Sequence, residues 1–175
     1  MKRILVLLLV FCTILGFASC KDEKSSGSGK GKDLTLGGSF DYSKYEGDRG
    51  VEISGRFKAV SNQYIDVRVK NTSSKKITVA KFYSVSYDAY GEFICDNFFD
   101  LGGKEIQAGD GLLLDMISVY HFKGDQVLIP SKVDIYAYNV YFEDGTEWGN
   151  RNAKKEEITD CCSYITIDNN SEINW

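Results

Sequence analysis

The sequence has very little of what most catalytic and metal sites require. Its 175 residues include a single histidine, His121, which excludes both an HExxH zinc-protease pair and a three-histidine metal site. The chain contains no GxSxG nucleophile motif, no GxxxxGK[ST] phosphate-binding loop and no GxGxxG dinucleotide-binding motif. We therefore expect a protein that is not an enzyme and that holds neither a metal nor a cofactor.

The few remaining combinations of reactive residues have simpler explanations. Cys95 and His121 could form a nucleophile and base pair of the cysteine-protease kind, but a lone histidine in a strand is usually satisfied by backbone or water. The stretch "DNNSE", 168–172, has the spaced oxygens of a calcium loop but lacks the glycine and the length of an EF-hand. A glycosidase would need two carboxylates facing one cleft, and the available pairs suit solvated turns: Asp96 with Asp100, and Asp110 with Asp115.

Positive charge is also scarce in the body of the chain. There are 21 Lys and Arg against 25 Asp and Glu, a net charge of −4. Loss of residues 1–19, which contain Lys2 and Arg3 and no acid, would make this net charge −6. The one lysine-rich stretch, "KSSGSGKGK", lies near the N-terminus. An acidic chain without a basic patch in its body binds nucleic acid poorly, so we expect no nucleic-acid partner.

The first twenty residues have the order of an export signal. Two basic residues precede an almost unbroken apolar run over 4–17, and two small residues separate that run from Cys20. The run is shorter than the about 20 residues that a helix needs to span a bilayer. The pattern therefore predicts a signal peptide over 1–19 rather than a transmembrane helix.

The stretch "FASC", residues 17–20, resembles the lipobox of bacterial lipoproteins, with phenylalanine where leucine is usual. The resemblance implies that Cys20 is lipidated and becomes the first residue of the mature chain. Several acyl chains on one cysteine would supply the two signals that stable membrane anchoring requires. The alternative is an ordinary signal peptide that ends at a chance cysteine. We expect an exported protein that is lipid-anchored to the cell envelope.

The residues that follow Cys20 suggest a spacer. "CKDE", 20–23, resembles the signal that directs some lipoproteins to the outer face of the outer membrane, although any solvated segment carries charges. The next residues are rich in glycine, serine and lysine, a composition typical of a flexible coil. We predict a lipidated tether over 20–39 that holds the folded body away from the membrane.

Residues 40–150 show the two-residue periodicity of strands. Ile65, Val67 and Val69, for example, alternate with polar residues, which predicts one buried face. Turn-forming residues separate these segments, and no long amphipathic helix competes with them. We predict an all-β fold, an antiparallel β-sandwich of about six to eight strands over 40–150. A C-terminal segment, 151–175, would form a tail that could pack on the sandwich.

Two local irregularities can also be predicted. Lys81 falls on the apolar side of the strand expected over 77–87, which indicates a β-bulge near Ala80. Asp144-Gly145, between two strand segments, predicts a two-residue hairpin loop.

Three stretches are similar to the small immunoglobulin-like domains of exported bacterial proteins, including the FxLYD type. They are "VRVKNTSSKKITVAKFYSVSYDAYGE", "IQAGD" and "YNVYFEDGTEWG". Val85, Tyr87 and Asp88, followed by Gly91, match the end of a strand in those domains, although Ser86 separates Val85 from Tyr87. The resemblance implies an immunoglobulin-like sandwich over about 50–150 and no catalytic residues.

Three cysteines lie in the exported body: Cys95, Cys161 and Cys162. Outside the cytoplasm a disulfide is the usual expectation. A bridge from Cys95 to either neighbour would tie the C-terminal segment to the sandwich and leave one free thiol. The two neighbours could also bridge each other, and a zinc site shared with His121 is a further, unusual option.

The strand "VDIYAYNVYF" is the most plausible binding surface in the sequence. Tyr136 and Tyr138 point to one face, and that face could present them to a sugar ring or a protein partner. Alternatively, the two tyrosines simply pack on the sheet.

Two functional classes follow from these features, with a third as a distant option. The first is a non-catalytic binding or interaction module at the cell surface, with an unknown protein or glycan ligand. The second is an accessory or stabilising subunit of a larger envelope or secretion complex. The third is an extracellular hydrolase.

Overall fold

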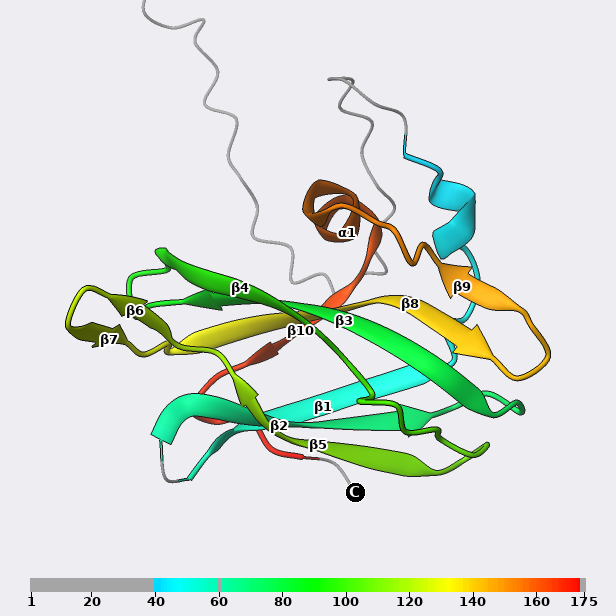
Figure 1. The fold of residues 1–175 in the computed structure, drawn as a ribbon, viewed down its shortest axis with the longest axis horizontal. Helices are drawn as coiled ribbons and strands as arrows, with labels where there is room; N and C mark the ends of the chain where they lie inside the picture. Colours follow the sequence, from blue (N-terminus) through cyan, green and yellow to red (C-terminus); the bar gives the residue numbers. More distant parts are fainter. Residues whose placement is uncertain (1–39, 60, 174–175) are drawn as a thin grey trace, which may run out of the picture.

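The computed structural model describes residues 40–59 and 61–173. The predicted signal peptide and tether, with the lipidation site Cys20, lie outside these residues. The described residues form two antiparallel sheets that face each other, with short helices on the outside (Figure 1). This arrangement confirms the predicted all-β sandwich.

Eight strands build the two sheets, within the predicted range. The three-stranded sheet has the order β1-β2-β5, and the five-stranded sheet has the order β10-β8-β3-β4 with β9 also paired to β8. All of these pairings are antiparallel. The order corresponds to strands A-B-E facing G-F-C-C′ of an immunoglobulin-like sandwich. The strands are β1 (Val51–Lys58), β2 (Ser61–Asn71), β3 (Ile77–Tyr87), β4 (Phe93–Asp100), β5 (Gly111–Ser118), β8 (Lys132–Phe142), β9 (Glu147–Gly149) and β10 (Tyr164–Ile167).

The main hydrophobic core lies between the sheets. Ile65, Val67 and Val69 of β2 are fully buried, as their alternation predicts. From the other sheet, Phe82 fills the core and stacks on Phe99, with ring centroids 5.1 Å apart. Burial of each such side chain contributes about 1.5–3 kcal/mol to folding. This inner face therefore supplies most of the hydrophobic stabilisation.

A β-bulge lies where the sequence predicts it. The register between β3 and β8 shifts on either side of Ala80. Because a slip of one residue reverses the faces of a strand, Ala80 and Phe82 join Ile77 in the core, while Tyr83 turns to the outer face of the sheet.

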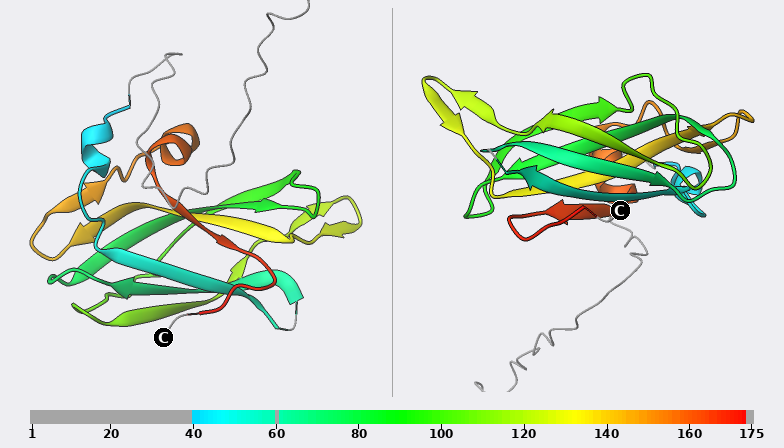
Figure 2. Two further views of the ribbon diagram at one scale, coloured as in Figure 1. Left: turned by 180° about the vertical axis from the view of Figure 1, so that it is seen from behind. Right: turned by 90° about the horizontal axis from the view of Figure 1, so that it is seen from below.

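The last strand of the sandwich is interrupted. Gly149 of β9 lies opposite Asn139 of β8, whereas Tyr164 of β10 lies opposite Tyr136. Between these two pairs β8 advances by three residues, whereas the chain that runs from β9 to β10 advances by fifteen. The extra residues include α1 (Lys155–Cys161), which lies on the outer side of the five-stranded sheet beside η1 (Tyr42–Tyr45), as Figures 1 and 2 show. The segment predicted to form a C-terminal tail therefore includes a helix and a strand of the sheet.

A small arm extends from the sandwich. Strands β6 (His121–Lys123) and β7 (Gln126–Leu128) form a separate two-stranded sheet that projects at one end of the molecule (Figure 2, right). Phe122 and Val127 pair across it, and both are exposed. A lone hairpin of this kind has little stability of its own.

Two predicted turns can be compared with the structure. Asp88 accepts amide hydrogens from Tyr90 and Glu92, and Gly91 has a φ of +83°, so the chain does turn after β3. The hairpin between β8 and β9 has a three-residue loop over 143–145, because the Phe142 amide donates to the Thr146 carbonyl. The predicted two-residue loop was therefore wrong by one residue. A three-residue loop of this kind requires a left-handed residue near its end, which is Gly145 with a φ of +84°.

Candidate binding site

Tyr136 and Tyr138, for which the sequence left an exposed platform or packing on the sheet as alternatives, are buried. Tyr136 and Tyr138 do lie on the outer face of the five-stranded sheet, but each is only 6% exposed. They belong to a second hydrophobic cluster with Tyr83, with Ile158 of α1 and with Cys162, which directly follows that helix. The predicted open surface was wrong because the inserted segment that carries α1 folds back over it.

Polar contacts fix α1 on this face. Lys155 donates to Asp96 of β4 at 2.5 Å, and the Tyr83 hydroxyl donates to the same carboxylate at 2.8 Å. Partial burial alone would raise the pKa of Asp96, but Lys155 and Tyr83 outweigh it and lower that pKa. Two residues further along the same turn of the helix, the buried Glu157 accepts hydrogen bonds from Tyr45 and Asn150, both at 2.9 Å. The helix is thus joined to β4, to η1 and to the segment that follows β9.

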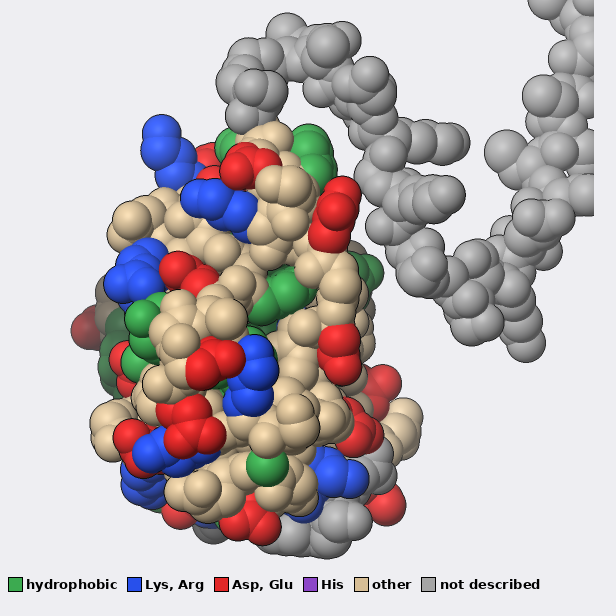
Figure 3. Space-filling model, turned by 90° about the vertical axis from the view of Figure 1, so that its right-hand side faces the viewer, with side chains coloured by type: hydrophobic (Ala, Val, Ile, Leu, Met, Phe, Trp, Pro, Cys, Tyr) green, Lys and Arg blue, Asp and Glu red, His purple; other side chains and the backbone are tan. Residues whose placement is uncertain are grey.

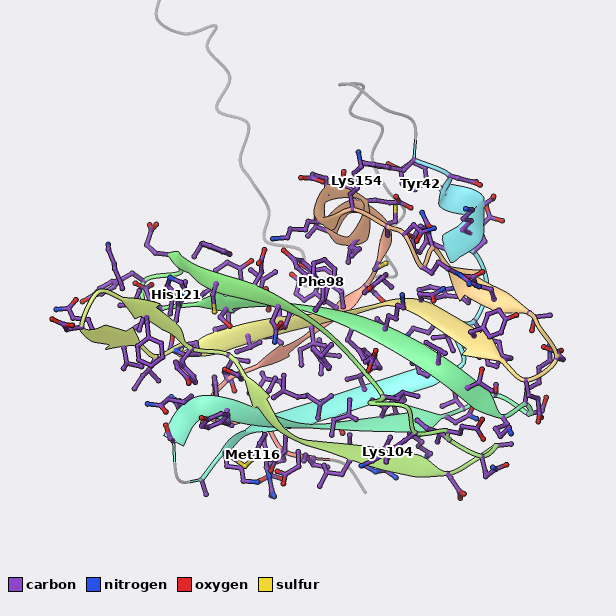
Figure 4. The ribbon with its side chains drawn as sticks, in the orientation of Figure 1. Tyr42, Phe98, Lys104, Met116, His121 and Lys154 are labelled. Atoms are coloured by element: carbon purple, nitrogen blue, oxygen red, sulfur yellow. The ribbon has the colours of Figure 1, made fainter. Side chains whose placement is uncertain are left out.

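Aromatic side chains remain partly open around this helix. Phe98 of β4 lies on the α1 side of the sheet and is 44% exposed (Figure 4). Its ring lies 4.8 Å from that of Tyr83 and 5.8 Å from that of Tyr138. Tyr164 of β10 is 53% exposed and packs on Tyr136 at 5.1 Å. Only the rim of the predicted aromatic surface is therefore accessible.

Two adjoining hollows mark the same outer face near the β8–β9 hairpin, and we call them together the Arg151 groove. The first has a volume of about 270 Å³ and the second about 330 Å³. Arg151 lines both. The first hollow is also lined by Val79, Lys81, Asn139 and Tyr141, and the second by Lys44, Glu147, Gly149, Asn150 and Asn152.

Arg151 is held in place by two neighbours. Its Nε and Nη2 atoms donate to the two carboxylate oxygens of Glu147, both at 3.2 Å. Its guanidinium group also lies over the ring of Tyr141, 5.2 Å from the ring centroid. The hydrogen bonds from Arg151 lower the pKa of Glu147, which also accepts from the Asn139 amide at 2.7 Å. The site therefore presents a guanidinium group of fixed orientation.

The Arg151 groove carries more positive than negative charge. Lys44 and Lys81 have no acidic side chain within 4 Å among the residues that the structure describes, whereas Arg151 is paired with Glu147. The lining thus has three cations and one anion in a protein whose net charge is −4. On the surface seen from the side of the β8–β9 hairpin, Lys and Arg side chains are interspersed with Asp and Glu (Figure 3). The excess of positive charge is thus a property of the groove lining and not of that whole surface.

Gly149 shapes the second hollow. Its φ is +80°, and a Cβ atom at this position would lie 2.1 Å from the carbonyl oxygen of Tyr138. Only glycine allows the end of β9 to approach β8 so closely and then turn toward α1. The glycine after "EDGTEW" was the one signal in the sequence for this site, and sequence analysis missed both it and Arg151.

The three cysteines are free thiols in this structure, and no disulfide joins residues within 40–59 and 61–173. Cys95 pairs with Ser86 on the inner side of the sheet and donates to the Val119 carbonyl at 3.4 Å. Cys162 belongs to the cluster on the opposite, outer face. Burial raises the pKa of Cys161 to about 11 and that of Cys162 to about 12, so both stay protonated at neutral pH.

The other reactive residues are engaged elsewhere or lie apart. His121 is exposed in the β6–β7 arm and has no hydrogen bond to Cys95. Asp96 is bound to Lys155, whereas Asp100 accepts the Gly102 amide hydrogen in a turn. Asp168 likewise accepts from Asn170 and Ser171 within a tight turn. Within the described part of the chain, no three His, Cys, Asp or Glu residues lie close enough to hold a metal ion.

None of the helices in the described residues is both long and apolar enough to cross a membrane. No family model matches the sequence, and no curated protein matches it.

Two solved structures to which this chain is distantly similar are a putative ApaA protein from Bordetella pertussis and a hypothetical protein from Peptoclostridium difficile 630. The first is 14% identical, with 67% of this chain and 90% of that chain covered and a TM-score of 0.40. The second is 11% identical, with 61% and 89% covered and a TM-score of 0.41. These similarities are too distant to bear on function, and the fold description rests on the strand order given above.

Proposed function

We propose that the protein is a non-catalytic binding module, exported as a lipoprotein and anchored to the cell envelope through Cys20. The Arg151 groove carries this proposal. Two hollows meet here at Arg151, and their lining combines two lysines without an acidic partner among the described residues, an arginine of fixed orientation and the aromatic ring of Tyr141. The order of charged, apolar and small residues before Cys20 supports export, and the tether would hold the sandwich away from the membrane.

The anchor can be tested in cells. The wild-type protein should incorporate a fatty-acid label and be cut by protease added to intact cells. Cys20→Ala should lose the label and be released or remain as unprocessed precursor. A Cys20→Ala protein that is still acylated and membrane-bound would show that the lipoprotein assignment is wrong.

The binding role can be tested with the purified mature protein in detergent. The protein should bind immobilised glycans or proteins saturably, and Arg151→Ala should weaken that binding while leaving the unfolding curve unchanged. Common hydrolase substrates should not be turned over. Turnover that disappears on a single substitution would contradict the non-catalytic role.

A second candidate function is an accessory subunit of an envelope complex. The exposed pair of Phe122 and Val127 on the β6–β7 arm favours it, because an apolar arm that projects from a sandwich can dock on a protein surface. In this case Phe122→Ser, and not Arg151→Ala, should separate the protein from its complex during gel filtration. The two variants therefore distinguish the two functions.

A further inference from the structure

We propose that the Arg151 groove binds a sugar acid, a pyranose unit that carries a carboxylate, within an oligosaccharide. The proposal rests on the proposed binding function and specifies its ligand. It is argued from four features of the groove: the excess of positive charge, the orientation of Arg151, the apolar floor and the second hollow.

The charge of the groove selects an anion. Lys81 and Arg151 line the first hollow, and its described lining contains no acidic residue. Glu147 lies in the second hollow, and both of its carboxylate oxygens already accept from Arg151. This balance attracts an anion, and the apolar floor of the first hollow, rather than the charge, favours a sugar carboxylate over a phosphate ion.

Arg151 is oriented to receive a carboxylate. Its Nε and Nη2 atoms face Glu147, so the covalent geometry of the guanidinium group directs Nη1 away from that acid. The end formed by Nη1 and the outer hydrogen of Nη2 can therefore hold a second carboxylate through two parallel hydrogen bonds. Because Glu147 and Tyr141 already restrain the side chain, little conformational entropy is lost when a ligand binds.

The floor of the first hollow is apolar. Val79 of β3 and Tyr141 of β8 lie directly opposite each other in the sheet, and Val79 is 37% exposed. A pyranose ring has one face made mainly of C–H groups, which can pack against Val79 and the part of Tyr141 that lines the hollow while its carboxylate reaches Arg151 and Lys81. A small inorganic anion would leave this floor uncovered.

The second hollow has the groups that sugar hydroxyls require. Asn152 is exposed there, Lys44 has no acidic partner among the described residues, and Asn150 is held by its bond to Glu157. Amides and amines of this kind donate to and accept from hydroxyl groups. Since both hollows are lined by Arg151, a sugar acid in the first would place the next sugar unit in the second.

Titration calorimetry with defined probes tests this inference. The probes are hexameric oligouronates of galacturonate, mannuronate and glucuronate, neutral hexaoses of matching linkage, and hexaglutamate. We expect at least one oligouronate to bind the mature protein at least about tenfold more tightly than its neutral counterpart, and this preference should shrink as salt is added.

Variants locate the effect in the groove. Lys81→Ala and Arg151→Ala should each weaken oligouronate binding by at least about tenfold, the loss expected for one charge-assisted contact. Lys104→Ala is the matched control, because Lys104 is an exposed lysine on the β5 side of the sandwich, away from the groove (Figure 4). It should bind as the wild type does.

Four results would overturn the inference. They are absence of oligouronate binding, equal affinity for neutral hexaoses, equal affinity for hexaglutamate, and binding that Arg151→Ala leaves unchanged. Equal affinity for neutral hexaoses that is still lost in Arg151→Ala would reject the sugar acid but keep the groove as a ligand site. Saturable binding to immobilised glycans or proteins that Arg151→Ala leaves unchanged would reject the proposed function itself.

Discussion

The inner face of the five-stranded sheet buries aliphatic residues and Phe82, whereas its outer face buries tyrosines beneath a helix that was inserted into the last strand. The side chains of the inner face are buried as soon as the two sheets pack against each other, and they need no further covering element. The outer face depends on polar contacts, such as that of the Tyr83 hydroxyl with Asp96, and burial together with this contact raises the pKa of Tyr83. The difference indicates that the inner face specifies the fold, while the outer face is a covered surface with an open groove at one end.

The largest effect should come from the inner face. Phe82 is fully buried, so Phe82→Ala should lower the free energy of unfolding by about 4 kcal/mol through lost packing and a new cavity. Phe98→Ala removes the same ring from the outer rim, where it is 44% exposed, and should cost about 1 kcal/mol. Urea denaturation measures both values. Equal losses would contradict the assignment of the two faces.

The covering helix should contribute less. Ile158 is the fully buried residue of α1, and Ile158→Ala should cost about 2–3 kcal/mol. It should also make Tyr136 and Tyr138 more reactive toward iodination, because the helix would no longer hold tightly against them. Thr159→Ala, an exposed change in the same helix, is the control. Unchanged tyrosine reactivity in Ile158→Ala would mean that α1 is not their cover.

A smaller, pH-dependent effect should come from Asp96. Because its pKa is lowered in the folded state, its contribution is fully present above its ordinary value of 3.8 and is lost as pH falls through the lower folded value. Between pH 5 and pH 2.5 the wild type should therefore lose about 1 kcal/mol more stability than Asp96→Asn. Parallel pH profiles for the two proteins would show that the contact with Lys155 and Tyr83 does not stabilise the fold.

Arg151 should have the smallest effect on stability. Its side chain is 52% exposed and that of Glu147 is 30% exposed, and ion pairs of this kind contribute little. Arg151→Ala should change the free energy of unfolding by less than about 0.5 kcal/mol in urea denaturation. A loss above about 2 kcal/mol would assign Arg151 a structural role in place of a binding role.

The regular parts of the sandwich could be predicted from the sequence because they follow local rules. Strict alternation placed Ile65, Val67 and Val69 in the core, and the misplaced Lys81 revealed a bulge. The same rule failed in β8. A register shift at Tyr138 puts Val140 in the core between the sheets. Strict alternation along the sequence would instead place Val140 on the same face as Tyr136, the outer face of the sheet. A slip of this kind depends on the partner strand and leaves no mark in the strand itself.

The groove could not be predicted because it depends on an insertion. A short, polar segment after Gly149 gives no sign that β10 will return to the edge of β8 and carry α1 over the tyrosines. Glu147 and Arg151 have the spacing of a helical ion pair, yet they meet across a turn at the end of β9. Their role follows from where Lys81 and Tyr141 lie in the folded sheet, and that information is not local.

The most direct test of the account is to map the bound ligand on the protein by NMR. On addition of an oligouronate, amide shifts should change around residues 79–81, 139–141 and 147–152, the segments that line the Arg151 groove. Amides of β1, β2 and β5, on the other sheet, should not change. Shifts confined to the β6–β7 arm or to the three-stranded sheet, or no shifts at all, would contradict the claim that the outer face carries the function.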